Sequence, residues 1–159
     1  MLHRLFLVAL VLAGLGHQSS AQTTKYRCLI QMTNYMGEGA YIAVSLINPQ
    51  GGYEKTLQVL GADKKWYSSL KEWHKFNAKN KVNISAVTGA SMTGGERSSV
   101  VLDIEDAKLN KGYKIRFESA VENQKYHNSD AEVPLTTEGL NAKTDGKGFI
   151  RYVRLAKTG

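Results

Sequence analysis

The residue best suited to carry chemistry is Ser91, a hydroxyl surrounded by small side chains. It ends the segment Thr88-Gly89-Ala90-Ser91 and is followed closely by the pair Gly94-Gly95. Glycine and alanine leave the hydroxyl sterically open, so a bulky group or another protein could reach it, and the glycine pair predicts a flexible loop. The structural alternative is a strand over Val82–Val87 that runs into a hairpin loop.

The other reactive side chains lack the spacing that catalysis or metal binding needs. His74 and His127 are far apart in the sequence, and neither belongs to a zinc-ligand pattern. Asp103, Glu105 and Asp106 lack the spacing of an EF-hand loop, and a polar turn is expected there. The sequence contains no nucleophile elbow and no phosphate-binding glycine loop. We therefore expect neither an enzyme nor a metal site.

The N-terminus has the features of a secretory signal peptide. Arg4 supplies a positive charge, Leu5–Leu15 is apolar, and Ser19-Ser20-Ala21 offers small residues at the cleavage positions. This pattern predicts a signal peptide over residues 1–21, cleaved after Ala21, and one mature domain over residues 22–159. The apolar run is too short for a comfortable membrane span. We expect a periplasmic or secreted protein that does not span the membrane after cleavage.

The length, charge and cysteine content of the mature chain indicate which class of protein it belongs to. Its length of about 140 residues suits a single domain with a hydrophobic core. The whole chain carries a formal net charge of +7, and removing Arg4 with the signal leaves +6. Because the lysines are scattered, they predict a solvated basic surface rather than a nucleic-acid site. Cys28 is the only cysteine, which excludes an internal disulfide, and its apolar surroundings predict a buried thiol.

Alternating apolar residues and regularly spaced turns predict an all-β fold. Tyr26–Met32, Tyr41–Ile47 and Tyr53–Leu60 have the pattern of a meander. Leu140–Gly148 is expected to be a loop. Further strands are expected over residues 98–104, 112–121 and 149–155, with an edge strand around Pro134. Seven or eight short strands of this kind indicate an antiparallel β-sandwich.

One segment has helical rather than strand periodicity. Its apolar residues recur at nearly helical spacing, Asp63 could cap its start, and polar residues 77–81 end it. We expect one short amphipathic helix whose aromatic row packs on a sheet, with Tyr67 and His74 pointing outward. The packed row is Trp66, Leu70, Trp73 and Phe76.

Several short segments, taken in chain order, resemble one known family. They are the turn Asn48-Pro49-Gln50-Gly51-Gly52, the strand Lys55-Thr56-Leu57, Trp66 with Leu70 and Trp73, the loop from Val87 to Ser91, and the segment from Gly112 to Glu118 with Glu122. The family is a group of predicted bacterial periplasmic proteins, domain of unknown function twenty-two seventy-one. The resemblance extends from Tyr26 to Leu155 and implies an immunoglobulin-like sandwich.

The resemblance also implies a setting and a cofactor. Members of the family occur beside PepSY-type membrane proteins and flavin transferases, which implies a redox or iron-related role at the cell envelope. The segment from Ser85 to Thr93 resembles the acceptor motif for covalent attachment of flavin mononucleotide (FMN) through a phosphodiester. Thr88, Gly89, Ala90 and Ser91 match that motif, with Ser91 as the acceptor. Ser85 stands where the motif has Asp, and Gly94 where a Ser often follows.

Two functional hypotheses follow from these patterns. The first is a non-enzymatic exported domain that works with a membrane redox or iron-uptake system, either carrying flavin or docking to a partner. The second is a structural or ligand- or protein-binding sandwich without a redox role. An enzyme that uses Ser91 or the acidic turn around Asp103, Glu105 and Asp106 ranks last, because no catalytic constellation supports it.

Overall fold

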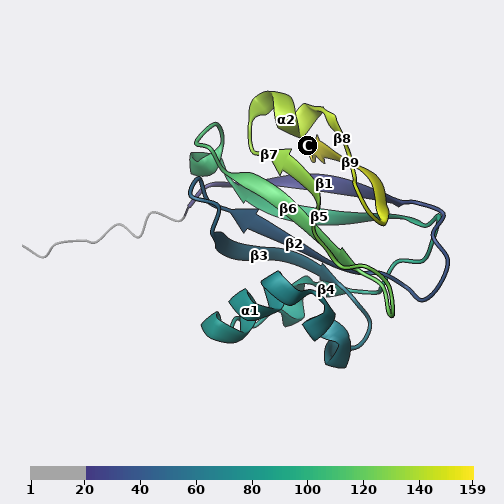
Figure 1. Cartoon of the computed structure of the whole chain (residues 1–159). Coiled ribbons are helices and arrows are strands. Elements are labelled where there is room, and N and C mark those ends of the chain that lie inside the picture. The colour runs from purple at the N-terminus through teal and green to yellow at the C-terminus, as the bar shows by residue number, and fades with distance from the viewer. Residues whose placement is uncertain (1–20) are drawn as a thin grey trace, which may run out of the picture.

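The protein, seen in a computed structural model that describes residues 21–159, is a sandwich of two β-sheets (Figure 1). The expected signal peptide lies outside the described residues, except for Ala21. Neighbouring strands are antiparallel, apart from a short parallel contact between β3 and β4. The first sheet has the order β5 (Arg97–Glu105), β1 (Thr23–Met32), β9 (Ile150–Lys157), β8 (Lys143–Asp145). The second has the order β4 (Thr88–Gly89), β3 (Tyr53–Leu60), β2 (Tyr41–Ile47), β6 (Lys114–Ala120), β7 (His127–Pro134). The expected antiparallel sandwich is confirmed, and so are the central position of β2 and the edge position of β7.

The main hydrophobic core lies between the two sheets. Alternation along β1 places Cys28, Ile30 and Met32 in this core, where they are fully buried. Phe117 of β6 enters the core from the opposite sheet. The prediction that Cys28 is a buried thiol is confirmed, and its burial raises the pKa of the thiol to about 12.

The expected three-stranded meander is wrong in its first strand. β1 pairs with β5 and β9, whereas β2 pairs with β3 and β6. The connection over residues 33–40 is long enough to cross from one sheet to the other, so adjacency in sequence does not become pairing. The turn at Asn48 is confirmed between β2 and β3, where Asn48 Oδ1 accepts from the amides of Gln50 and Gly52 at 3.0 and 2.9 Å.

Two segments have structures that the sequence patterns did not predict. The expected loop over Leu140–Gly148 begins in helix α2 (Thr137–Asn141) and contains β8. Thr136 Oγ1 caps this helix by accepting from the amide of Gly139 at 2.9 Å, and the buried Leu140 anchors it. The expected strand over Val82–Val87 is also wrong, because Asn83 Oδ1 accepts from the Ser85 amide at 3.1 Å and starts the 3₁₀ turn η2 (Ser85–Val87).

The helical segment is divided into the 3₁₀ helix η1 (Lys64–Ser69) and the α-helix α1 (Lys71–Asn80). Asp63 caps η1 as expected, accepting from the Lys65 amide at 3.0 Å. A 3₁₀ helix has three residues per turn, so Tyr67 and Leu70 share the buried face with Trp73. Trp66 therefore lies off that face and is 44% exposed, whereas Tyr67 is only 6% exposed. The expectations that Trp66 is packed and Tyr67 points outward are both wrong, because the period changes from 3.6 to three.

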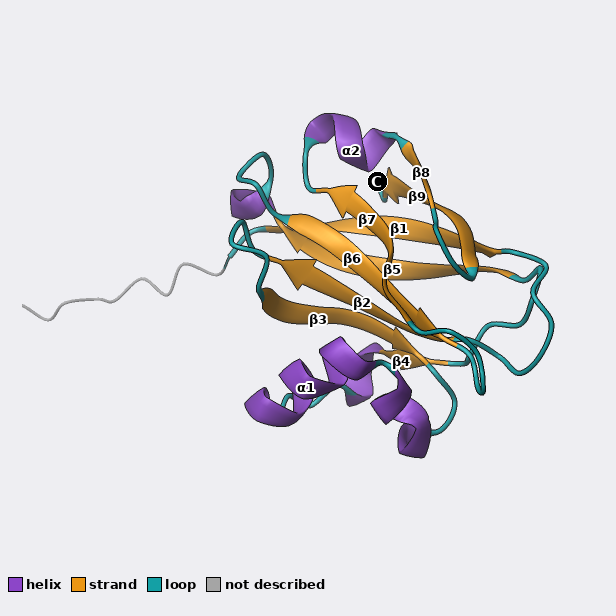
Figure 2. Ribbon diagram, in the orientation of Figure 1, coloured by secondary structure: helices purple, strands orange, loops and turns teal. Residues whose placement is uncertain are grey.

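This helical segment covers the outer face of the second sheet and forms a smaller second core there (Figure 2). Trp73 is fully buried at its centre, and its indole N–H donates to Thr56 Oγ1 at 2.9 Å. The rings of Trp73 and Tyr67 meet edge to face with centroids 5.6 Å apart. The members of this second core are Ala43, Val59, Tyr67, Leu70, Trp73, Ile84 and Ala120. His74 is half-buried on α1.

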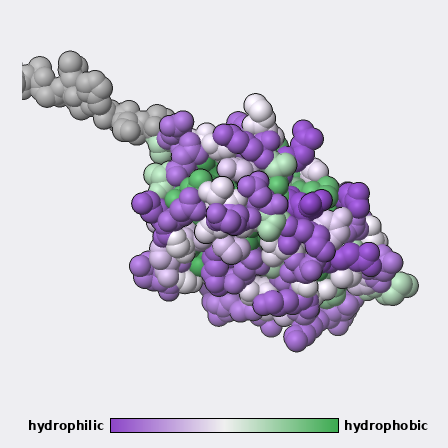
Figure 3. All heavy atoms as spheres, turned by 90° about the horizontal axis from the view of Figure 1, so that it is seen from above, coloured by the Kyte–Doolittle hydropathy of each residue, from purple (hydrophilic) through white to green (hydrophobic). Residues whose placement is uncertain are grey.

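The surface of the sandwich is mainly polar. The face seen from above, over α2 and the C-terminal strands, shows hydrophilic residues with only small apolar spots between them (Figure 3). Within residues 21–159, every helix is too short or too polar to cross a lipid bilayer.

Replacing each of the two tryptophans tests this assignment of faces. We expect Trp73→Ala to lower the free energy of unfolding by about 3–5 kcal/mol, because it leaves a cavity and an unpaired Thr56 hydroxyl. Trp66→Ala, the matched control, should cost about 1 kcal/mol or less, since the ring is partly exposed. Chemical denaturation measures both values, and equal losses would contradict the assignment.

Candidate functional site

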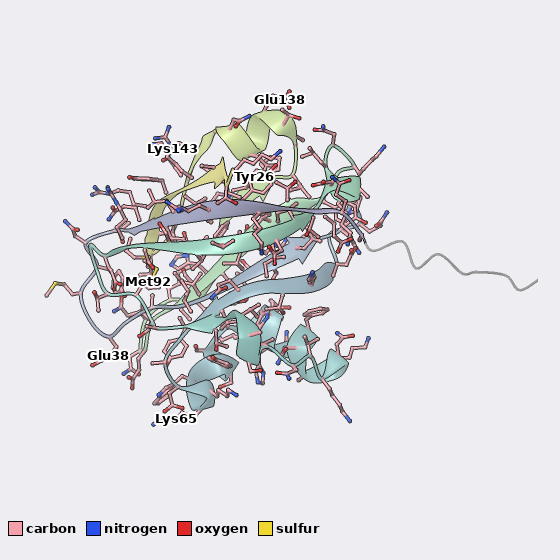
Figure 4. The ribbon with its side chains drawn as sticks, turned by 180° about the vertical axis from the view of Figure 1, so that it is seen from behind. Tyr26, Glu38, Lys65, Met92, Glu138 and Lys143 are labelled. Carbon is pink, nitrogen blue, oxygen red and sulfur yellow. The ribbon has the colours of Figure 1, made fainter. Side chains whose placement is uncertain are left out.

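Ser91 lies on the segment that crosses from the second sheet to the first, between β4 and β5. Glu38 and Met92, on two neighbouring crossing segments, lie together at the end of the sandwich away from the described N-terminus (Figure 4). Met92 is buried, whereas Ser91 is half-buried. Both crossing connections, residues 33–40 and 90–96, therefore meet at the end of the sandwich that carries Ser91.

Backbone hydrogen bonds fix the position of Ser91. Met92 and Ala40 exchange two bonds, with the Ala40 amide 2.6 Å from Met92 O and the Met92 amide 3.0 Å from Ala40 O. The Tyr35 hydroxyl also donates to Met92 O and accepts from the Ala40 amide. A Cβ atom at Gly39 would lie 2.6 Å from Ser91 Oγ, so Gly39 is the residue that leaves space for the hydroxyl.

The pair Gly94-Gly95 packs closely against a neighbouring segment, whereas the sequence predicted a flexible loop there. A Cβ atom at Gly94 would lie 2.0 Å from the carbonyl oxygen of Tyr35, which only glycine avoids. Gly95 has a φ of +77° and donates its amide to Thr33 O at 2.8 Å. The two glycines therefore hold the Ser91 segment against residues 33–35.

The Ser91 side chain borders a hollow of about 140 Å³. Tyr41, Trp66 and Ala120 give this hollow an aromatic and apolar side. Beyond Trp66 and Ala120 it adjoins a second hollow of about 280 Å³, which Tyr126 and Lys71 also line. We call the two hollows together the Ser91 groove. Its polar lining comes from Glu38, Ser69, Ser91, Glu122, Asn123 and Gln124.

The structure does not bring the other three motif residues to this groove. Thr88 and Gly89 form β4, and they line a separate shallow hollow with Ala90. Ser85, at the position of the motif aspartate, is exposed on η2 and donates its hydroxyl to Asn83 Oδ1 at 2.7 Å. Of the predicted site residues, Ser91 alone faces the groove.

Sequence reasoning missed most of the groove lining. Tyr41, Trp66 and Glu122 come from three distant segments, and no local spacing joins them. The three-residue period of η1 is the signal that could have placed Trp66 at the surface. No group of three or more histidine, cysteine or acidic side chains within residues 21–159 is close enough to hold a metal ion. The ring of His127 packs edge-on against the ring of Phe149, and the two ring centroids are 5.2 Å apart.

A buried carboxylate, Glu118, holds the helical wall of the groove on the sheet. Glu118 is fully buried, and its Oε1 accepts from the Tyr53 hydroxyl. Its Oε2 accepts from the Tyr126 hydroxyl at 2.5 Å and from the Trp73 amide at 3.2 Å. The Tyr126 hydroxyl in turn accepts from the Glu72 amide at 3.0 Å. The first turn of α1, whose amides lack partners within the helix, is thus bonded to β6 and to Tyr126.

Burial raises the pKa of the Glu118 carboxyl, although hydrogen bonds from Tyr126, Tyr53 and the Trp73 amide oppose this shift. Burial and the adjacent Glu118 carboxylate raise the pKa values of Tyr53 and Tyr126 as well. The raised Glu118 pKa means that the fold favours the neutral carboxyl. This contribution to stability is complete below the unfolded-state pKa of about 4.3, and it is lost as the pH rises through the folded-state pKa.

Glu118→Gln tests this linkage. The amide can accept from Tyr126 and Trp73 and donate to the Tyr53 oxygen, so we expect the variant to fold. Because Gln does not titrate, wild type should lose free energy of unfolding relative to the variant as the pH rises from about 4 to 7. Denaturant unfolding at a series of pH values measures the difference, and Glu122→Gln is the matched control for net charge. A difference that stays constant with pH would contradict the linkage.

Comparison with known proteins places the chain in a family. A family model described as a predicted periplasmic protein, DUF2271, matches residues 23–152. No curated protein and no solved structure gives a significant match. The family match begins at the first residue of β1 and ends inside β9, so it includes both sheets, the helical segment and Ser91. The chain therefore belongs to the predicted periplasmic protein family DUF2271.

Proposed function

We propose that this protein is a non-enzymatic periplasmic domain that carries FMN covalently on Ser91. In this role it works with a membrane-bound redox or iron-uptake system of the envelope, with a PepSY-type protein as partner and a flavin transferase as modifying enzyme. One observation carries the proposal: the Ser91 side chain opens into a groove that has a partly exposed tryptophan in its wall.

The dimensions and lining of the Ser91 groove suit a flavin. Its two adjoining hollows have volumes of about 140 and 280 Å³, and the second is close to the lower end of the range of about 300–1,000 Å³ that is usual for ligand pockets. A flavin mononucleotide has a phosphate at one end and a flat aromatic ring at the other. Ser91 would hold the phosphate end, and Trp66, Tyr41 and Tyr126 offer aromatic surface for the ring.

Some charged side chains of the groove repel the phosphate of a flavin mononucleotide, and others attract it. Glu38 and Glu122 are exposed carboxylates, and they repel a phosphate near Ser91. Water and salt screen this repulsion, because both side chains are at the surface. Lys71 lines the far hollow, and Lys65 Nζ lies 5.4 Å from the centroid of a Trp66 ring. The net positive charge of the domain also favours an anionic group.

Attachment would form one bond and break one. The Ser91 oxygen joins the phosphorus of the flavin mononucleotide, and the phosphorus separates from the nucleotide half of a flavin dinucleotide donor. The hydroxyl proton passes to a base of the transferase. Once attached, the flavin supplies electron transfer, and the protein supplies position and surroundings. The fixed backbone around Met92 would keep the tether in one place relative to Trp66.

Intact-mass measurement tests the attachment. We expect the mature protein, co-produced with an active flavin transferase, to gain one flavin mononucleotide less one water. Ser91→Ala should lose the gain entirely, whereas the matched control Ser99→Ala, at an exposed serine of β5, should keep it. An unmodified wild-type mass, while the same transferase modifies a known acceptor, would contradict the proposal.

Ser85→Asp tests whether the missing motif carboxylate limits the reaction. Ser85 is exposed, so an aspartate there is sterically tolerated and available to the transferase. We expect a higher modified fraction in the same time, measured by the same intact masses. Modification that appears only in Ser85→Asp would mean that this chain has lost its acceptor function.

A second candidate function is binding without flavin at the same groove. Glu38 and Glu122 beside the exposed ring of Trp66 favour a cationic ligand or a basic segment of a partner protein. If this is the function, the protein should stay unmodified under all conditions. The Ser91→Ala variant should then bind the partner as strongly as the wild-type protein does.

A further inference from the structure

Strand β5 has a long free edge. Its nine residues pair with β1 on one side, in a register without a bulge, and no strand of residues 21–159 pairs with its other side. Natural sheets protect such edges by short strands, charged side chains, proline or bulges. The other sheet edges follow this rule: β8 and β4 have three and two residues, and β7 has Pro134 and an irregular register. β5 is longer and contains no proline, and its charged residues Arg97, Asp103 and Glu105 flank a central apolar pair, Val100 and Val101.

The backbone of β5 shows which residues face the free edge. The Met32 amide donates to Glu96 O at 2.9 Å and the Asp106 amide to Gln22 O at 3.0 Å, so even-numbered positions at both ends of β5 bond to β1. Antiparallel ladders alternate, so the odd-numbered residues direct their N–H and C=O groups away from β1. These residues are Arg97, Ser99, Val101, Asp103 and Glu105. Val101, at their centre, is 50% exposed.

We propose that two copies of this protein associate through their β5 strands, antiparallel, with the two-fold axis at Val101. In this register Val101 lies opposite Val101 of the second copy, and the two residues exchange both backbone bonds. Ser99 then lies opposite Asp103 of the second copy, and Arg97 opposite Glu105. Every outward-facing backbone group of the strand gains a partner, and the two four-stranded sheets become one continuous sheet.

Charge complementarity selects the second copy as the occupant of this edge. The register brings Arg97 of each copy to Glu105 of the other, at both ends of the interface. Arg97 has no carboxylate partner within the described chain; it bonds only to the polar side chains of Gln31 and Tyr152. A register centred on Val100 would move Glu105 beyond the end of the partner strand. The sequence of β5 thus complements itself best about Val101.

A hollow adjoins this edge of β5. This hollow of about 250 Å³ lies between β5 and β3, with Val101 and Asp103 on one side and Leu57 and Val87 on the other. Its partly apolar lining would be covered by the partner strand. The pairing uses only β5, which does not include Ser91, and it does not depend on the proposed function.

Disulfide trapping tests the axis. Cα atoms of a hydrogen-bonded antiparallel pair are about 5.5 Å apart, which a disulfide can span. We expect Val101→Cys in the mature protein to form a disulfide-linked dimer under mild oxidation. Ser99→Cys is the matched control, because the two copies of residue 99 are separated along the strands, and it should remain monomeric. The native Cys28 is buried and cannot compete. Equal cross-linking of both variants, or of neither, would overturn the proposal.

A charge exchange tests the register. Arg97→Glu and Glu105→Arg should each shift the dimer towards monomer in sedimentation velocity, because like charges then face each other. The double variant should restore the wild-type dimer. If the double variant melts at the wild-type temperature but does not form the dimer, the register is wrong. If the wild-type protein stays monomeric at all concentrations, the whole proposal is wrong. Binding of an extended peptide of another protein in place of the second copy would also overturn the proposal.

Discussion

A buried carboxylate determines where the helical segment lies on the second sheet. Glu118 points out of the sheet, away from the main core, and its two oxygens accept three hydrogen bonds from β3, from Tyr126 and from the first turn of α1. A charged group without partners at this depth would cost several kcal/mol. The three donors offset that cost, and one of them, the Trp73 amide, belongs to α1. The helix is therefore held by a directional contact as well as by apolar packing.

The Ser91 groove exists because two separately fixed walls meet. One wall is the helical segment that Glu118 holds, and it presents Trp66 and Ser69. The other wall is the pair of crossing connections joined by the Ala40–Met92 backbone bonds, and it presents Ser91. Both walls are held by hydrogen bonds within the chain, and such a groove favours binding by limiting the loss of conformational freedom. A group tethered at Ser91 would find an aromatic surface at a constant position, as an electron-transfer cofactor requires.

The sequence predicted the strands well and the connections poorly, for physical reasons. The pattern of apolar residues is a local signal, and it located β1, β2, β3 and β6 because β1 has one side in a core and the other three have both. The partners of β1 could not be predicted, since pairing with β5 and β9 depends on contacts far apart in the chain. The 3₁₀ period of η1 changed which of Trp66 and Tyr67 is buried. Ser91 was identified from its small neighbours and from its resemblance to a flavin acceptor motif, but its groove is assembled from distant segments and leaves no local pattern.

We propose that a flavin tethered at Ser91 lies in the groove against Trp66. Flavin fluorescence of the protein co-produced with a flavin transferase tests it directly, because an aromatic ring in contact with a flavin quenches its emission. We expect weak emission from the wild-type protein and a clear increase in Trp66→Ala, at equal flavin content. Emission as strong as that of free flavin mononucleotide in both proteins would contradict the claim.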